Sequence, residues 1–159
     1  MDEPRNKKDL VAEILKCAKS PEYFLKSYGF IQHPIKGLIK FDTYAYQDDL
    51  LKAFSDHRFN IVLKSRQVGI TTLVAGYIAW LAYFYQDKNI LIVATKQEVA
   101  KNVIRIIRII FKNLPKWFNL SKVSIDNKQS IELTNGSRVK ATTTASDAGR
   151  SEALSLLIV

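Results

Sequence analysis

Cysteine, methionine and histidine are scarce in this sequence, which has one Cys, one Met and two His among 159 residues. Cys17 has no second cysteine to pair with, so a disulfide framework and a zinc module built on cysteines are excluded. With only His33 and His57, we expect no histidine-rich metal site. The polar first residues, Met-Asp-Glu-Pro-Arg, lack the apolar core of a signal peptide, and we therefore expect an intracellular protein.

Acidic residues are also few, with 15 Asp and Glu against 24 Lys and Arg, which gives a formal net charge of +9. The hydrophobic share of 47% and the charged share of 25% are not those of a disordered tail or a low-complexity linker. The length allows about one domain with its own core. The basic excess indicates a polyanionic partner, nucleic acid or nucleotide, without identifying it.

Charged residues are absent between Gln67 and Gln86, so a membrane-spanning helix has to be considered. The run opens with polar residues and a glycine, which are costly in lipid or break a helix, and short apolar strands flank it. A helix enclosed in an α/β core explains the same apolar composition. We expect this alternative and no membrane association.

Apolar residues recur at helical spacing in several segments. Ser20 and Pro21 are suited to cap and begin a short helix, which Gly29 ends. Pro115 stops the last helix. We therefore expect helices over residues 6–19, 21–28, 46–57, 73–85 and 98–113.

Strand-like runs lie between and after these helices. We expect strands over residues 59–63, 89–95, 123–125, 130–133, 138–144 and 154–159, and short strands or an extended loop over residues 31–42. The runs 89–95 and 154–159 are continuously apolar, as in strands buried on both faces, and Asn135-Gly136 predicts a hairpin with a type I′ turn. The order of elements predicts an α/β sheet with at least some parallel pairing. Because the sequence stops within an apolar run, we expect it to be a fragment.

The stretch Lys-Ser-Arg-Gln-Val-Gly-Ile-Thr-Thr, residues 64–72, lies between a predicted strand and a predicted helix. Phosphate-binding loops occupy this position, because the free N–H groups of the helix N-terminus point at the anion. We align the stretch with the pattern G-x-x-x-x-G-K-[ST] on Gly69 and Thr71. It then departs from the pattern twice, with Lys64 at the first glycine position and Ile70 at the lysine position.

The chemistry of such a loop needs a glycine for close approach, a hydroxyl for Mg²⁺ and a cation for the β- and γ-phosphates. Gly69 and Thr71 supply the first two. The cation could be Lys64, whose long side chain can reach back over the phosphates, or Arg66 within the loop. The alternative is an ordinary polar loop in which Thr71 caps the following helix.

The loop resembles the Walker A loop of phage large terminase subunits, the ATPases that package viral DNA, some of which carry the lysine at the loop start. Other stretches resemble further segments of that family in the same order. They are residues 21–34 (the N-terminal segment), 41–48 (the adenine-recognition segment), 126–137 (the β-hairpin that leads to the Walker B strand), and 148–150 with 156–159 (the approach to the Walker B acids). The resemblance covers nearly the whole chain.

The resemblance implies a P-loop NTPase fold of the ASCE/RecA-like type, with three layers around a parallel sheet core, incomplete at the C-terminus. Residues 1–40 would form an N-terminal helical and extended segment, and residues 41–159 a partial ATPase domain that ends at the Walker B strand, with the nuclease domain absent. The cofactors would be ATP and Mg²⁺. The partners would be double-stranded viral DNA, the portal protein, the small terminase subunit and further copies in a ring, in the host cell cytoplasm and not in the mature virion.

Carried over by position, the resemblance implies that Lys64 contacts the β- and γ-phosphates, that Thr71 ligates Mg²⁺ and that Gln47 recognises adenine through its amide. Two arginines take catalytic roles, Arg66 as a charge stabiliser in the same subunit and Arg150 as an arginine finger acting on a neighbouring subunit. A solvated loop arginine is the alternative for Arg150. The other residues that the resemblance places in cofactor binding are Ser65, Gln67, Val68, Gly69, Ile70 and Thr72.

In that family an apolar strand such as Leu-Leu-Ile-Val, residues 156–159, is followed at once by an Asp-Glu pair that serves Mg²⁺ and the attacking water. The pair is missing from this sequence. We therefore expect an ATPase by family, but no useful ATPase activity from these 159 residues.

Two other functions stay open. A superfamily-2-like helicase or translocase shares the strand-loop-helix unit and a glutamine-based adenine site, but wants glycine where Lys64 stands and lysine where Ile70 stands. A non-catalytic basic nucleic-acid-binding domain is the other. Four cations on one face of the helix over residues 98–113 either contact a DNA backbone or simply face solvent: Lys101, Arg105, Arg108 and Lys112.

Overall fold

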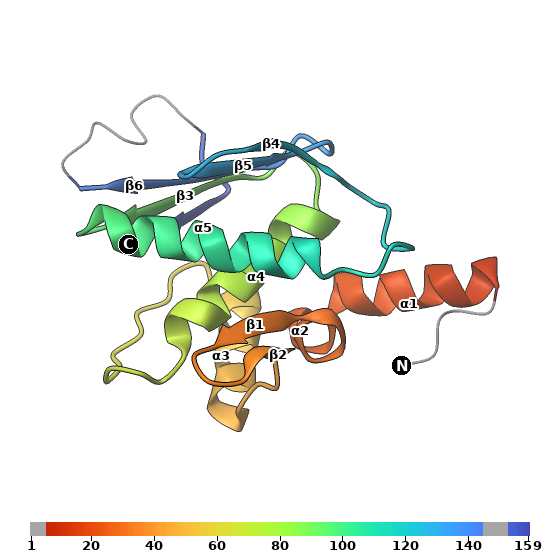
Figure 1. Cartoon of the computed structure of the whole chain (residues 1–159), viewed down its shortest axis with the longest axis horizontal. Coiled ribbons are helices and arrows are strands. Elements are labelled where there is room, and N and C mark those ends of the chain that lie inside the picture. Colours follow the sequence, from red (N-terminus) through yellow and green to blue (C-terminus); the bar gives the residue numbers. More distant parts are fainter. Residues whose placement is uncertain (1–5, 145–152) are drawn as a thin grey trace.

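The computed structural model describes residues 6–144 and 153–159 of the chain, in which helices lie on one side of a β-sheet (Figure 1). The helices are α1 (Lys7–Lys19), α2 (Pro21–Tyr28), α3 (Ala45–Asp56), α4 (Ile70–Phe84) and α5 (Gln97–Lys112). The strands are β1 (Phe30–His33), β2 (Gly37–Lys40), β3 (Asn89–Ala94), β4 (Val123–Asp126), β5 (Ser130–Leu133), β6 (Arg138–Thr143) and β7 (Leu156–Ile158).

Five strands form one mixed sheet in the order β4-β5-β6-β3-β7. Strand β3 pairs in parallel with β6 on one side and with β7 on the other, so that Ile90 lies opposite both Val139 and Leu156. The strands β4, β5 and β6 pair antiparallel in succession, while β1 and β2 form a separate hairpin. The predicted α/β fold with partial parallel pairing is confirmed.

The core lies between one face of this sheet and the helices α4 and α5. Ile90 and Ile92 of β3 and Val139 of β6 are buried in it. Helix α5 lies against β3 and β6, and α2, α3 and the β1–β2 hairpin lie on the other side of α4 and α5 (Figure 1). Among the described residues, no helix covers the second face of the sheet, so the three-layer arrangement is not seen in this part of the chain.

The two N-terminal helices are confirmed and pack into the same core. Asn6 caps α1 and Ser20 caps α2, each by accepting hydrogen bonds from backbone N–H groups at its side-chain oxygen. The indole Nε1 of Trp80 donates to the carbonyl oxygen of Cys17 at 2.8 Å, which ties α1 to α4. Burial raises the pKa of the Cys17 thiol to about 12, as expected for a cysteine that packs as a small apolar residue.

The predicted hairpin between β5 and β6 is confirmed, but its turn is not of type I′. A type I′ turn needs positive φ at both central residues, whereas here only Gly136 has it, at 83°. The N–H of Gly136 donates to the carbonyl oxygen of Leu133 at 3.1 Å, as in hairpins built on a type I turn followed by a left-handed glycine. The Asn135 amide instead donates to the carbonyl oxygens of Ala82 and Tyr85 at the end of α4, so the hairpin tip caps this helix.

The strand predicted over residues 59–63 is wrong. No strand lies between α3 and α4 in the described structure, and the side chains of Phe59 (82% exposed), Ile61 and Leu63 (100% each) face solvent. A strand is stabilised by a paired neighbour, and this segment pairs with none of the described strands. The last run also differs from expectation, because β7 is an edge strand and Leu157 is 53% exposed instead of buried on both faces.

The remaining helix and strand predictions hold to within a few residues at their ends. The apolar stretch after Gly69 is the helix α4, which is buried between the sheet and the N-terminal elements. In the described ranges, the structure has no helix with the length and apolar character that crossing a membrane requires.

Ile104 and Ile61 form a matched pair for testing this fold, because one is fully buried in α5 and the other fully exposed. Ile104→Ala should lower the free energy of unfolding by about 2–5 kcal/mol through lost burial and a cavity. Ile61→Ala should change it by less than about 0.5 kcal/mol. Urea unfolding followed by circular dichroism measures both values. A loss of similar size in the two variants would mean that residues 59–63 are a buried strand after all.

Candidate functional site

The loop that leads into α4 presents a row of free backbone donors. Gly69 precedes the helix in the left-handed conformation (φ 70°), and Gln67 has a positive φ of 63°. Within the described structure, the N–H groups of residues 65–69 donate no hydrogen bond, and the first bond of the helix runs from the N–H of Leu73 to the carbonyl of Gly69. Consecutive free N–H groups at a helix N-terminus favour an anion, because their dipoles and that of the helix add.

A cavity of about 330 Å³ lies beside this loop. It is lined by Lys64, by Ile70 and Thr71 at the start of α4, and by residues at the carboxyl ends of the three parallel strands: Ala94 and Thr95 at the end of β3, Thr144 after β6, and Ile158 and Val159 at the end of β7. In open α/β sheets, ligands bind in the crevice at the carboxyl ends of the strands. Among the described residues, the lining side chains include one cation and no Asp or Glu, a charge pattern that suits a phosphate.

Gln47 holds the loop from behind. Its side chain is 2% exposed, and its Oε1 accepts from the N–H of Tyr44 at 3.1 Å. Its Nε2 donates weakly to the carbonyl oxygen of Val68 at 3.4 Å, and the hydroxyl of Tyr46 donates to the same oxygen at 2.8 Å. A Cβ at Gly69 would lie 2.8 Å from Gln47 Nε2, so this position favours glycine both for its positive φ and for close approach.

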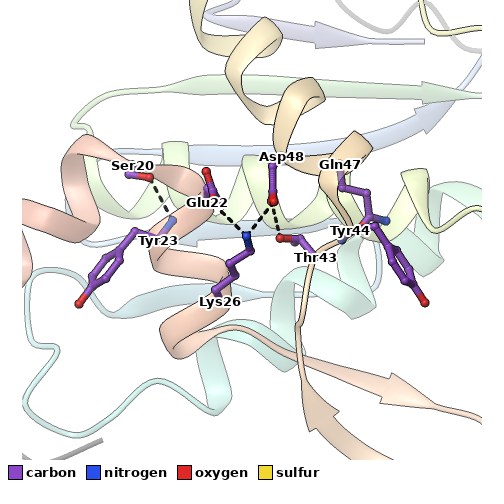
Figure 2. A network of polar contacts seen from close by, with 8 residues as sticks. All are labelled: Ser20, Glu22, Tyr23, Lys26, Thr43, Tyr44, Gln47 and Asp48. Carbon is purple, nitrogen blue, oxygen red and sulfur yellow. Dashed lines mark hydrogen bonds and ion pairs between the residues drawn. The ribbon is translucent and has the colours of Figure 1, made fainter.

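A polar network fixes the first turn of α3, where Gln47 lies (Figure 2). The ammonium of Lys26 contacts the carboxylate of Asp48 at 2.7 Å and that of Glu22 at 2.8 Å. The hydroxyl of Thr43 donates to the other oxygen of Asp48. The two carboxylates raise the pKa of Lys26, and Asp48 has the larger effect of the two. The same contacts join α2 to the start of α3. The loop is thus held by a framework that begins in the N-terminal helices.

The structure brings only some of the predicted site residues together. Lys64, Ile70 and Thr71 line the cavity. Thr71 is the second residue of α4 and not its cap, which is Gly69, so the alternative in which Thr71 caps the helix is wrong. The other described residues of the predicted site do not line the cavity: Gln47, Ser65, Arg66, Gln67, Val68, Gly69 and Thr72. Arg150 lies outside the described residues.

The fit to Mg²⁺ is incomplete. Magnesium sites usually combine one or two carboxylates with phosphate oxygens and water. Thr71 offers a hydroxyl to the cavity, but among the described residues no Asp or Glu side chain lines it, and these residues hold no group of three or more His, Cys, Asp or Glu that could bind a metal. The residues present therefore fit a phosphate better than they fit the metal, and Thr71 as a metal ligand stays a prediction.

The basic face of α5 is partly neutralised. The guanidinium of Arg108 contacts Asp126 at 2.6–2.9 Å and donates to the carbonyl of Asn127 at 2.9 Å. Lys101 contacts Glu98 at 3.1 Å. Two of the four cations on this face are therefore held by acids of the same chain, and a DNA contact there stays a prediction.

Sequence reasoning missed three residues of this site. Thr95 and Thr144 follow directly after β3 and β6 and line the cavity, and Tyr46 supports the loop through Val68. A usable signal was the polar residue that immediately follows a buried strand, because parallel strands place such residues at one edge of the sheet. Predicting that Thr95 and Thr144 lie together required knowing that β3 pairs with β6, and the sequence alone does not reveal this pairing.

No known family model matches this chain.

Gln47 and Gln86 form a second matched pair, because one is buried behind the loop and the other is an exposed glutamine. Gln47→Ala should lower the free energy of unfolding by about 1–3 kcal/mol, since it deletes a buried side chain and leaves the Tyr44 N–H without its acceptor. It should also move the backbone amide resonances of residues 67–69. Gln86→Ala should do neither, with a change below about 0.5 kcal/mol. Equal effects of the two variants in chemical unfolding and in amide spectra would mean that Gln47 does not hold the loop.

Proposed function

We propose that this chain is the nucleotide-binding part of a DNA-packaging motor of the phage large terminase type, with a P-loop NTPase fold and with ATP as its ligand. The observation that carries the proposal is the loop 64–72, in which the N–H groups of residues 65–69 are free and Lys64 and Thr71 line the cavity at the carboxyl ends of three parallel strands. A triphosphate needs this combination of backbone donors and a mobile cation. The order of the family-like motifs along the sequence supports the same assignment.

In this proposal the phosphates lie over the loop. The N–H groups of residues 65–69 donate to phosphate oxygens, and the ammonium of Lys64 lies over the β- and γ-phosphates in place of the lysine missing at position 70. Gln47 is within reach of the loop and recognises the adenine edge once its weak bond to Val68 is released. Arg66 is exposed next to the phosphates, where it stabilises negative charge.

The larger assembly is part of the proposal. Its members are double-stranded viral DNA, the portal protein, the small terminase subunit and further copies of the chain in a ring, in the host cell cytoplasm. The net charge of +9 supports a polyanionic partner of this kind.

Nucleotide binding is tested by the thermal unfolding of the chain with and without ATP, and by calorimetric titration. ATP at a hundredfold excess over its dissociation constant should stabilise the chain by about 2.7 kcal/mol. Lys64→Ala should weaken binding by about 10–100-fold, because it removes a charge-assisted contact. Hydrogen exchange gives an independent signature, since the free amides of residues 65–69 should exchange fast alone and slow down with ATP.

The matched control for Lys64→Ala is Lys116→Ala, which removes an exposed lysine that does not line the cavity and should leave the affinity unchanged. Thr71→Ser keeps the hydroxyl and should bind as the parent does, whereas Thr71→Val loses it. No stabilisation by ATP, together with retained binding of duplex DNA, would favour the non-catalytic nucleic-acid-binding alternative.

Hydrolysis is expected to be absent. No Asp or Glu side chain lines the cavity among the described residues, so no acidic side chain there orients an attacking water. Phosphate release from ATP should stay at the uncatalysed rate with Mg²⁺ present, and adding EDTA should change nothing. Steady turnover that EDTA abolishes and that Thr71→Val lowers would show that an acid outside the cavity lining completes the site.

A further inference from the structure

The carbonyl group of Val68, in the loop before α4, is held by side chains and not by the helix that follows it. The hydroxyl of Tyr46 donates to its oxygen at 2.8 Å, and Nε2 of Gln47 donates to the same oxygen at 3.4 Å. Within the described structure, no backbone N–H donates to this oxygen, and the first bond of α4 ends on the carbonyl of Gly69 instead. The donors on the Val68 carbonyl therefore come from the first turn of α3.

Holding the Val68 carbonyl also sets the direction of the Gly69 N–H. The peptide bond between the two residues is trans, so its C=O and N–H groups point in opposite directions. Because the oxygen is turned towards α3, the N–H points away from α3, and it donates to no other group of the described structure. A flipped peptide would present its carbonyl oxygen in place of the N–H, and this oxygen would repel an anion. The orientation of this one peptide therefore decides whether the end of the loop offers a donor or an acceptor.

Tyr46 is the stronger of the two donors. A distance of 2.8 Å is normal for a bond from a hydroxyl, whereas 3.4 Å is longer than the usual range for a bond from an amide. The ring of Tyr46 is stacked on that of Tyr44, with the ring centres 5.7 Å apart and the planes at 8°, which restricts where its hydroxyl can lie. In the described structure, the hydroxyl of Tyr44 has no hydrogen-bond partner. One hydroxyl of the stacked pair is thus committed to the loop, and the other is free.

We propose that Tyr46 is a positioning residue of the candidate phosphate loop. Its hydroxyl keeps the Val68 carbonyl turned towards α3 and so aims the Gly69 N–H at a phosphate oxygen. It also maintains this orientation when the amide of Gln47 leaves Val68 for the adenine edge, because it is then the remaining side-chain donor on that carbonyl. Tyr46 does not line the cavity and acts through the backbone alone. This inference rests on the proposed function, because it assigns a role at the same nucleotide site.

Tyr46→Phe and Tyr44→Phe form a matched pair, because each removes one hydroxyl from the stacked rings and only the first hydroxyl is bonded. Tyr46→Phe should weaken the binding of ATP by about 2–10-fold, the range expected for one lost hydrogen bond, and Tyr44→Phe should bind ATP as the parent does. Inorganic tripolyphosphate has no base, so Gln47 stays on Val68 and the loss in Tyr46→Phe should be smaller. Calorimetric titration of the full chain measures these affinities.

The direction of the Gly69 N–H is measured without ligand, from its residual dipolar coupling in amide NMR spectra. Tyr46→Phe should change this coupling and leave those of Ile90 and Ile92 in β3 as they are, whereas Tyr44→Phe should change none of them. A merely structural role of Tyr46 would lower stability without turning this one peptide. Urea unfolding of both variants shows whether they are equally stable.

Several outcomes would overturn the positioning role and leave the proposed function standing. They are unchanged ATP affinity in Tyr46→Phe, the same loss in Tyr44→Phe, an equal loss for ATP and tripolyphosphate, and an unchanged Gly69 coupling in Tyr46→Phe. Failure of the proposed function has a different signature, because the parent chain would then bind neither ATP nor tripolyphosphate. That result would overturn the inference together with the function on which it rests.

Discussion

Enclosure of the helix α4 is the constraint on which the rest of the structure depends. Most of its residues are buried, including Leu73, Ile78 and Trp80, so the chain has to cover it on nearly every side. The sheet with α5 covers one side, and α2 and α3 cover the other. Gly76 permits the closest approach, because a Cβ there would lie 2.9 Å from the Leu25 side chain. Fixing α4 also fixes the direction of its N-terminus, and this end carries the candidate phosphate site.

The same enclosure explains why the N-terminal elements matter for the site. They bury α4, and through the Lys26–Asp48 contact they also set the position of Gln47 and so of the loop before α4. One charge network therefore connects a structural layer to the backbone donors of the site. Its ion pairs are partly exposed and add little to stability on their own, so their main effect is to orient α3.

The elements with a local cause were predictable from the sequence. The caps Asn6 and Ser20, the apolar run of β3 and the position of the loop before α4 all follow from neighbouring residues. The strand prediction for residues 59–63 was wrong because it rested on their composition, whereas a strand also needs a paired neighbour, which composition does not reveal. The site prediction missed Thr95 and Thr144 for the same reason, because they line one cavity only through the pairing of strands that are distant in the sequence.

Lys64 lines two cavities, the crevice at the strand ends and a second one between β7 and residues 58–64. A standard loop carries its lysine directly before the hydroxyl residue, at the start of the helix, where the backbone is already ordered. Here that position is Ile70, which is 7% exposed and packs into the core, so in the proposed site the cation is Lys64, from the unpaired flank of the loop. Ordering a free lysine and its backbone costs about 2–4 kcal/mol of conformational entropy. Any contact that orders residues 58–64 beforehand would bear that cost, so in the proposed site the phosphate affinity would depend on the order of the segment that precedes the loop.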